Sequence, residues 1–169
     1  LGLKNAGAIP DLVGRKVLIL GSGGAARAVG HALIRHGAAV TLTNRNRERG
    51  RSLAAELGCA FTSWENRGAE SCEILVNCTP VGMHPNLDES PFEQHWLSDS
   101  TLVFDTVYNP ENTLLVKEAT AIGCHIVTGV DMFVRQAAIQ HRIWHGVEPP
   151  QGVMREALKK ATSSARTHE

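Results

Sequence analysis

The fold of this chain is decided by the stretch Lys16-Val17-Leu18-Ile19-Leu20-Gly21-Ser22-Gly23-Gly24-Ala25-Ala26-Arg27-Ala28. An apolar run ends at Gly21, a glycine-rich turn follows, and alanines open a segment with a new period. From Ala25 the apolar residues recur at i, i+3, i+4, i+7 and i+8, until Gly37 supplies a helix stop. The stretch therefore predicts a buried strand, a tight turn and a helix with one apolar stripe.

A glycine turn placed between a strand and a helix is typical of dinucleotide-binding folds, because free N–H groups at the helix N-terminus attract a pyrophosphate. Gly21 would permit the tight turn, Gly23 a close backbone approach, and the small Ala26 close packing of helix on strand. The residues predicted to hold the pyrophosphate are Gly21, Ser22, Gly23, Gly24 and Ala25. A turn with a purely structural role is the alternative.

The next apolar run ends in Asn44-Arg45-Asn46-Arg47-Glu48-Arg49. Folds that bind NAD usually carry a carboxylate at this point, where it binds the ribose 2′-hydroxyl. Arginine stands here instead, and guanidinium groups suit phosphate oxygens. If a helix begins near Asn46, Arg45 and Arg49 are i, i+4 neighbours. We therefore predict that Asn44, Arg45 and Arg49 bind the 2′-phosphate of NADP. A solvated helix face is the alternative, and it is our interpretation of Arg47 and Arg51.

Short apolar runs alternate with helical periods along the chain. Several runs are continuously apolar, which is typical of parallel strands that are covered on both faces. The predicted strands are residues 16–21, 39–44, 59–61, 73–78, 101–106 and 125–128, and the later helices are 46–58, about 112–123, 131–144 and a final helix after Pro149-Pro150. Residues 82–100 are predicted to be a long surface connection with a short helix near Trp96. The fold class is α/β: a doubly wound, Rossmann-like parallel sheet of about six strands, with helices on both faces and a C-terminal helix.

Composition excludes several classes of function. The 17 basic and 17 acidic residues cancel, so neither nucleic acid nor a membrane surface is an expected partner. No apolar run is long enough to cross a membrane, and no signal peptide is evident, so we expect a cytoplasmic protein. The four cysteines form no Cys-x-x-Cys pair, so no metal site is predicted.

Three further blocks point to a family. They are Asn77-Cys78-Thr79-Pro80-Val81-Gly82-Met83, Asp105-Thr106-Val107-Tyr108-Asn109-Pro110 with Thr113-Leu114-Leu115, and Gly129-Val130-Asp131-Met132-Phe133-Val134-Arg135-Gln136-Ala137. With the glycine turn and the arginine segment, they resemble the C-terminal NADP-binding domain of shikimate dehydrogenase over nearly the whole chain. The resemblance divides the chain into a lead-in from a missing substrate domain (1–15), an NADP-binding domain (16–161) and a polar tail (162–169).

The resemblance implies an NADP-dependent oxidoreductase that transfers hydride reversibly between NADPH and 3-dehydroshikimate to give shikimate, in aromatic amino-acid biosynthesis. It implies that Thr79, Pro80, Val81 and Thr106 line the cofactor near its nicotinamide half, that Gly129 and Met132 pack at the nicotinamide ring, and that Tyr108 and Gln136 contact the substrate. Asn46 departs from the family, which often has threonine there.

In the family, the acid/base lysine and its partner aspartate belong to the N-terminal substrate domain, which this chain lacks. We therefore expect the chain to bind NADP without turnover, with no catalytic residue of its own, and to share its small-molecule substrate with the missing domain. Loss of that domain would expose one wall of the cleft, so self-association is plausible. A quinate/shikimate dehydrogenase relative and a non-catalytic NADP-binding sensor module remain alternatives. The blocks at Tyr108 and Met132 disfavour glutamyl-tRNA reductase.

Overall fold

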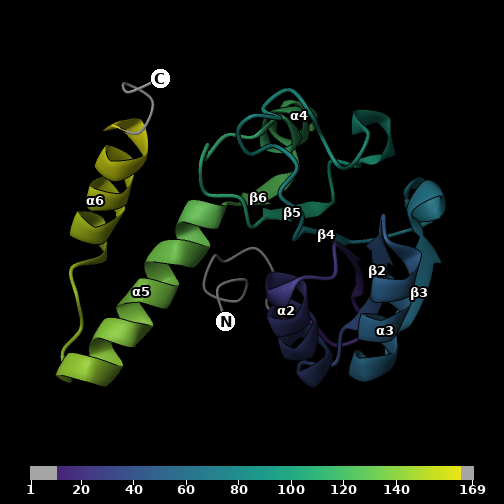
Figure 1. Cartoon of the computed structure of the whole chain (residues 1–169), viewed down its shortest axis with the longest axis horizontal. Helices are drawn as coiled ribbons and strands as arrows, with labels where there is room; N and C mark the ends of the chain where they lie inside the picture. Colours follow the sequence, from purple (N-terminus) through teal and green to yellow (C-terminus); the bar gives the residue numbers. More distant parts are fainter. Residues whose placement is uncertain (1–10, 165–169) are drawn as a thin grey trace.

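The computed structural model describes residues 11–164 and holds one parallel sheet (Figure 1). Its six strands are β1 (Lys16–Leu20), β2 (Ala39–Asn44), β3 (Ala60–Ser63), β4 (Ile74–Asn77), β5 (Leu102–Asp105) and β6 (His125–Val127). Their order is β3-β2-β1-β4-β5-β6, and every neighbouring pair is parallel. The doubly wound α/β fold is confirmed. Each predicted strand matches an observed one, with both of its ends within two residues of the observed ends.

The middle strands are buried because helices cover both faces of the sheet. Every residue of β4 and β5 is buried, as is β1 after Lys16. The helices are α2 (Gly24–Arg35), α3 (Arg47–Leu57), α4 (Leu114–Ile122), α5 (Gly129–His145) and α6 (Gln151–Ser164), with 3₁₀ turns η1 (Trp64–Ala69) and η2 (Gln94–Trp96). One core cluster joins α2, α3 and Met132 of α5 to one face, and a second joins α4 and the tryptophans of η1 and η2 to the other.

Local signals fix where the helices begin and end. Asn46 caps α3 by accepting a hydrogen bond from the Arg49 amide at 2.9 Å, and Gly58 ends it with a φ of +67°. The third helix begins later than predicted: Thr113 caps α4, so residues 112 and 113 lie outside it. The helix predicted over 131–144 is α5, which begins earlier, at Gly129, because Thr128 and Asp131 form a capping box.

The prediction for residues 82–100 was partly wrong. The short helix near Trp96 exists as η2, but Phe92 is only 1% exposed and belongs to the second core cluster. Its ring meets that of Trp96 edge to face, with centroids 5.2 Å apart. This connection therefore covers the sheet instead of only crossing the surface. The 3₁₀ turn η1 was not predicted.

The structure also describes residues near the two predicted domain boundaries. Leu12, in the predicted lead-in, is fully buried in the first core cluster, and Gly14 donates to the Gly37 carbonyl at 2.8 Å. Residues 1–10 of that lead-in and 165–169 of the predicted tail lie outside the described residues. Helix α6 continues to Ser164, so the predicted tail begins inside a helix.

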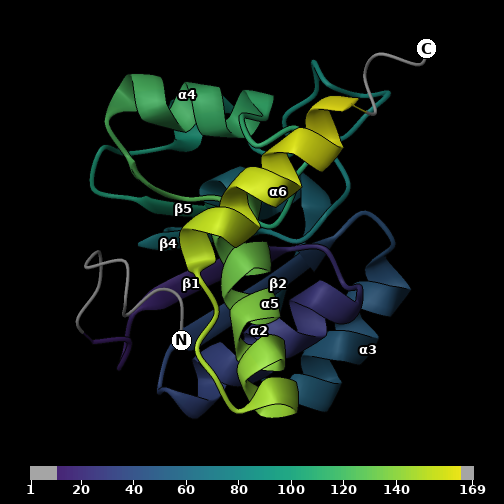
Figure 2. The same cartoon turned by 90° about the vertical axis from the view of Figure 1, so that its left-hand side faces the viewer.

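Helices α5 and α6 pack together as an arm beside the sheet, as Figures 1 and 2 show from two sides. Arg155 of α6 joins them by ion pairs to Asp131 and to Glu111. The arm carries a set of exposed apolar side chains: Ile139, Ile143, Trp144, Val147 and Val153. Within residues 11–164, no helix combines the length and apolar character that a membrane span needs.

Candidate functional site

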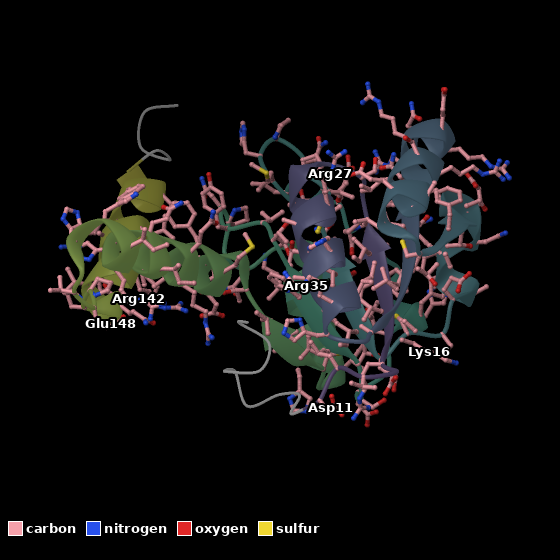
Figure 3. The ribbon with its side chains drawn as sticks, turned by 90° about the horizontal axis from the view of Figure 1, so that it is seen from below. Asp11, Lys16, Arg27, Arg35, Arg142 and Glu148 are labelled. Carbon is pink, nitrogen blue, oxygen red and sulfur yellow. The ribbon has the colours of Figure 1, made fainter. Side chains whose placement is uncertain are left out.

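The predicted cofactor residues gather at one edge of the sheet. They lie at or after the ends of β1, β2, β4, β5 and β6, and the carboxyl ends of parallel strands share an edge. Figure 3 separates the two edges: Lys16 at the start of β1 and Arg27 in the first turn of α2 lie on opposite sides. The strand order reverses between β1 and β4, which is where ligands bind in open α/β sheets.

Gly21 is required by the turn after β1. Its φ is +106°, and a Cβ there would lie 2.8 Å from the Cys78 carbonyl oxygen. Its amide donates to the Thr43 carbonyl at 2.8 Å. The turn is therefore fixed between the ends of β2 and β4. Gly23 differs, since a Cβ built on it meets no atom within 4 Å and its φ is ordinary.

The N-terminus of α2 lacks the side-chain cap that the neighbouring helices have. Asn46, Thr113 and Thr128 cap α3, α4 and α5, whereas Gly23 offers α2 no side chain, and the first turn of α2 holds no acidic residue. Gly24 and Ala25 are exposed there. The first amides of α2 can therefore be satisfied by an anion together with the positive end of the helix dipole.

The end of β2 is basic, as predicted, but the geometry of Arg45 differs from our prediction. Helix α3 begins at Arg47, so Arg45 precedes it and is not a helical i, i+4 neighbour of Arg49. Its guanidinium carbon lies 5.4 Å from the ring centroid of Trp64 instead. Arg49 is exposed in the first turn of α3. The Asn44 side chain donates to the Asn46 carbonyl at 2.8 Å and so shapes this turn.

Behind the turn after β4, a buried polar network joins two strand ends. Asn77 and Asp105 are register partners and both are fully buried. Asn77 Nδ2 donates to Asp105 at 3.0 Å, and the other oxygen of Asp105 accepts from Thr113 Oγ1 at 2.7 Å. The Val107 amide also donates to Asp105, at 3.0 Å. This geometry gives Asp105 a structural role.

Burial shifts the pKa values of two groups in this region upward. Burial raises the pKa of Asp105, against the lowering effect of its hydrogen bonds from Thr113, Val107 and Asn77. The pKa of Cys78 is raised to about 12, mainly by burial and to a lesser extent by the nearby charge of Asp105. Cys78 therefore stays a thiol at neutral pH and offers no nucleophile.

The same network holds the loop predicted to line the cofactor. Asn77 Oδ1 accepts from the amide of Thr79 at 2.9 Å and from its hydroxyl at 2.7 Å. Pro80 is exposed, Thr79 and Thr106 are half-buried, and Val81 is buried. The side chain of Val81 thus belongs to the interior, and only its backbone can face a ligand.

Close packing requires glycine at position 129, because a Cβ there would lie 2.2 Å from the Val107 carbonyl oxygen. One turn along α5, Met132 packs on the first core cluster, and the exposed Gln136 follows it. Met132 and Gln136 line a groove of about 500 Å³ between α2 and α5, together with Ala28 and Ile139. The structure therefore brings Met132 and Gln136 together in one groove, whereas Gly129 does not line it.

Tyr108 lies in a different cavity. It is 38% exposed, and its ring centroid is 5.2 Å from that of Phe133 on α5. The cavity that it lines, of about 660 Å³, also has Lys117 and Lys159 in its wall. Tyr108 and Gln136 thus do not share a cavity in this structure, although both were predicted to contact one substrate.

Sequence reasoning missed Trp64, and it assigned no role to Asn77 and Thr113, although both stand in the family blocks. Trp64 directly follows Ser63, whose register partner Asn44 directly precedes Arg45. Asn77 ends an apolar strand, and Thr113 precedes a helical period. A polar residue at the end of a continuously apolar run was a usable signal for such a network.

Comparisons with known proteins agree on one family. The family profile described as "Shikimate / quinate 5-dehydrogenase" matches residues 4–112, and that of the "Shikimate 5'-dehydrogenase C-terminal domain" matches residues 129–159. "Shikimate dehydrogenase (NADP(+))" of Archaeoglobus fulgidus is 40% identical over 168 residues, which is 95% of this chain and 62% of the relative. The corresponding protein of Methanosarcina mazei is 38% identical over 89% of this chain and 57% of its own length.

Solved structures agree with this assignment. Shikimate 5-dehydrogenase of Thermus thermophilus in complex with NADP(H) and shikimate has a TM-score of 0.82 and 38% identity, over 95% of this chain and 59% of that one. Quinate dehydrogenase of Corynebacterium glutamicum in complex with NAD has a TM-score of 0.84 and 28% identity, over 94% and 59%. This chain spans about 60% of the length of these relatives, and it belongs to the shikimate/quinate 5-dehydrogenase family.

Proposed function

We propose that this chain is the NADP-binding part of a shikimate dehydrogenase. The observation that carries the proposal is the pairing of an α2 N-terminus without a side-chain cap and an arginine end of β2. The first site suits a pyrophosphate, and the second suits a 2′-phosphate because Arg45 stands where NAD folds usually place a carboxylate. The relatives named for NADP(+) support the same cofactor.

The residues of this chain would bind and orient the cofactor, and the bound cofactor would supply or accept the hydride. The amides after Gly23 would hold the pyrophosphate, and Arg45 and Arg49 the 2′-phosphate. Thr79, held by Asn77, would orient the nicotinamide half. By the family resemblance, the lysine that gives or takes the proton and its aspartate partner belong to a part of the relatives that this chain does not span. We therefore propose that the chain alone binds NADP and does not turn over.

The cofactor proposal is tested by calorimetric titration of the chain with NADP⁺ and with NAD⁺. Replacing Arg45 by Ala removes a charge-assisted contact, so it should weaken NADP⁺ binding by about 10- to 100-fold and leave NAD⁺ binding unchanged. Arg51→Ala is the matched control, because Arg51 is exposed on α3 and its guanidinium lies over Phe61 instead. An unchanged ratio of the two affinities in Arg45→Ala would argue against the assignment.

Turnover is tested with NADP⁺ and shikimate, and in parallel with NAD⁺ and quinate, since a structural relative is a quinate dehydrogenase in complex with NAD. We expect the chain to form no reduced cofactor in either mixture. Shikimate-dependent formation of NADPH by the chain alone would contradict the division of labour proposed here. Reduction with quinate and NAD⁺ would favour the quinate alternative.

A further inference from the structure

Arg45 belongs to no helix or strand that would hold its side chain in place. It lies between the last residue of β2 and the cap of α3, and its side chain is exposed. Within residues 11–164, no carboxylate forms an ion pair with it, and its guanidinium carbon lies 5.4 Å from the ring centroid of Trp64. A flexible arginine without such a contact would have to be ordered when a ligand binds, which weakens binding.

The sheet itself brings Trp64 to Arg45. Asn44 and Ser63 are register partners in the parallel pair β2–β3, and Arg45 and Trp64 are the residues that follow them. Both strands end at the same edge, so the first residue after each one lies beside the other. Strand register therefore brings Arg45 and Trp64 within reach of each other, and the side chain of Arg45 completes the contact.

Trp64 is itself held in place. It is half-buried against the second core cluster, and its carbonyl accepts from Arg67 Nη1 at 2.6 Å. The Arg67 guanidinium lies 4.2 Å from the Trp64 ring centroid, and its Nε donates to the Pro91 carbonyl at 2.8 Å. Gly68 packs so closely on Trp96 that a Cβ would lie 2.3 Å from the ring. These contacts hold the indole ring of Trp64 in a fixed position, and we call this ring the platform.

Two cations meet at this platform, and two carboxylates lie near one of them. Two guanidinium groups, those of Arg45 and Arg67, share one ring. Burial lowers the pKa of Arg67, and the charge of Arg45 also lowers it, whereas Glu93 and Glu65 raise it. Because Arg67 donates to two carbonyls, Arg45 is the one of these two cations that is available to a phosphate.

We propose that Trp64 is a positioning residue for the 2′-phosphate of NADP: its ring holds the Arg45 guanidinium at the end of β2 through a cation–π contact. This inference rests on the proposed cofactor preference and adds a residue to it. Trp64 does not touch the cofactor in this scheme, and it acts through Arg45.

The test compares dissociation constants for NADP⁺ and NAD⁺ in Trp64→Leu, Trp64→Phe and Arg45→Ala. Leucine fills space without a π-face, whereas phenylalanine keeps an aromatic ring. A partly exposed cation–π contact predicts that Trp64→Leu lowers the preference for NADP⁺ over NAD⁺ by about two- to fivefold, with NAD⁺ binding unchanged. Trp64→Phe should keep most of the preference. In an Arg45→Ala background, Trp64→Leu should cause no further change, since the cation is gone.

The outcomes separate the inference from the proposed function. If Arg45→Ala lowers the preference and Trp64→Leu does not, only the role of Trp64 is overturned. Equal weakening of both cofactors by Trp64→Leu would make Trp64 a packing residue and would also overturn it, as would equal losses in Trp64→Leu and Trp64→Phe. If Arg45→Ala leaves the preference unchanged, the 2′-phosphate site and the role of Trp64 fail together.

Discussion

At the β1–β2 half of the sheet the groups beyond the strand ends face outward, whereas at the β4–β5 half they face one another. Gly23 and Arg45 are exposed, and the α2 N-terminus has no side-chain cap. Asn77 and Asp105 are fully buried and bonded together. The first half therefore has amide and guanidinium groups that can bind a ligand. In the second half the polar groups bond to one another and hold the loops after β4 and β5 in place. Substitutions in the two halves should accordingly have different effects.

The largest expected effect is on stability, from the inward-facing half. Asp105→Ala would leave the donors of Asn77, Val107 and Thr113 unpaired in the interior. We expect the free energy of unfolding, measured by urea denaturation, to fall by about 3–5 kcal/mol. Asp88→Ala, which removes an exposed carboxylate from the connection over 82–100, is the control and should change it by less than about 0.5 kcal/mol. Similar stability in both variants would refute the proposed importance of the network.

Two glycines of one turn should separate folding from binding. Gly23→Val places a side chain in open space where the pyrophosphate would lie, so the chain should fold normally and lose both NADP⁺ and NAD⁺ binding. Gly21→Val meets the Cys78 carbonyl and a positive φ, so it should lower the free energy of unfolding by about 1–3 kcal/mol or more. Thermal denaturation and calorimetric titration of both variants check this. Normal cofactor binding by Gly23→Val would remove the basis for a phosphate site at this turn.

The pH dependence of stability should depend on Asp105. Because burial raises its pKa in the folded state, the folded chain binds more protons than the unfolded chain above the ordinary Asp value of 3.8. The contribution of Asp105 to stability is therefore fully present below that value and is lost as pH rises through the raised pKa. Asp105→Asn should remove this decline. Denaturation at several pH values compares the two chains, and parallel pH profiles would show that Asp105 does not titrate in this way.

The smallest expected effect lies in the α5–α6 arm. Arg155 is about one-third exposed, and its ion pairs with Asp131 and Glu111 join α6 to α5 and to the loop after β5. Arg155→Met should lower overall stability by no more than about 1 kcal/mol and speed amide exchange in α6. Arg142→Met removes the more exposed pair with Glu148, at the far end of the arm in Figure 3, and should leave exchange in α6 unchanged. Equal exchange in the two variants would mean that Arg155 does not anchor α6.

Local patterns predicted the outward-facing half better than the inward-facing one. The glycine turn is one short stretch of sequence, and the Asn46 cap with the arginines after β2 is another, so a local pattern could indicate each of them. The network of Asn77, Asp105 and Thr113 depends on the register of two strands that are distant in sequence. The same holds for Trp64 beside Arg45, and for Phe92, which a loop-like sequence carries into the core. The separation of Tyr108 from Gln136 depends on how α5 lies over two cavities, which no local pattern specifies.

The most direct test of the central claim is the affinity of the unmodified chain for NADP⁺ and for NAD⁺, measured by calorimetry under one set of conditions. An arginine at the end of β2, in place of a carboxylate, predicts that NADP⁺ binds more tightly by about tenfold or more. Equal affinities, or tighter binding of NAD⁺, would contradict the assignment of this edge of the sheet as an NADP site.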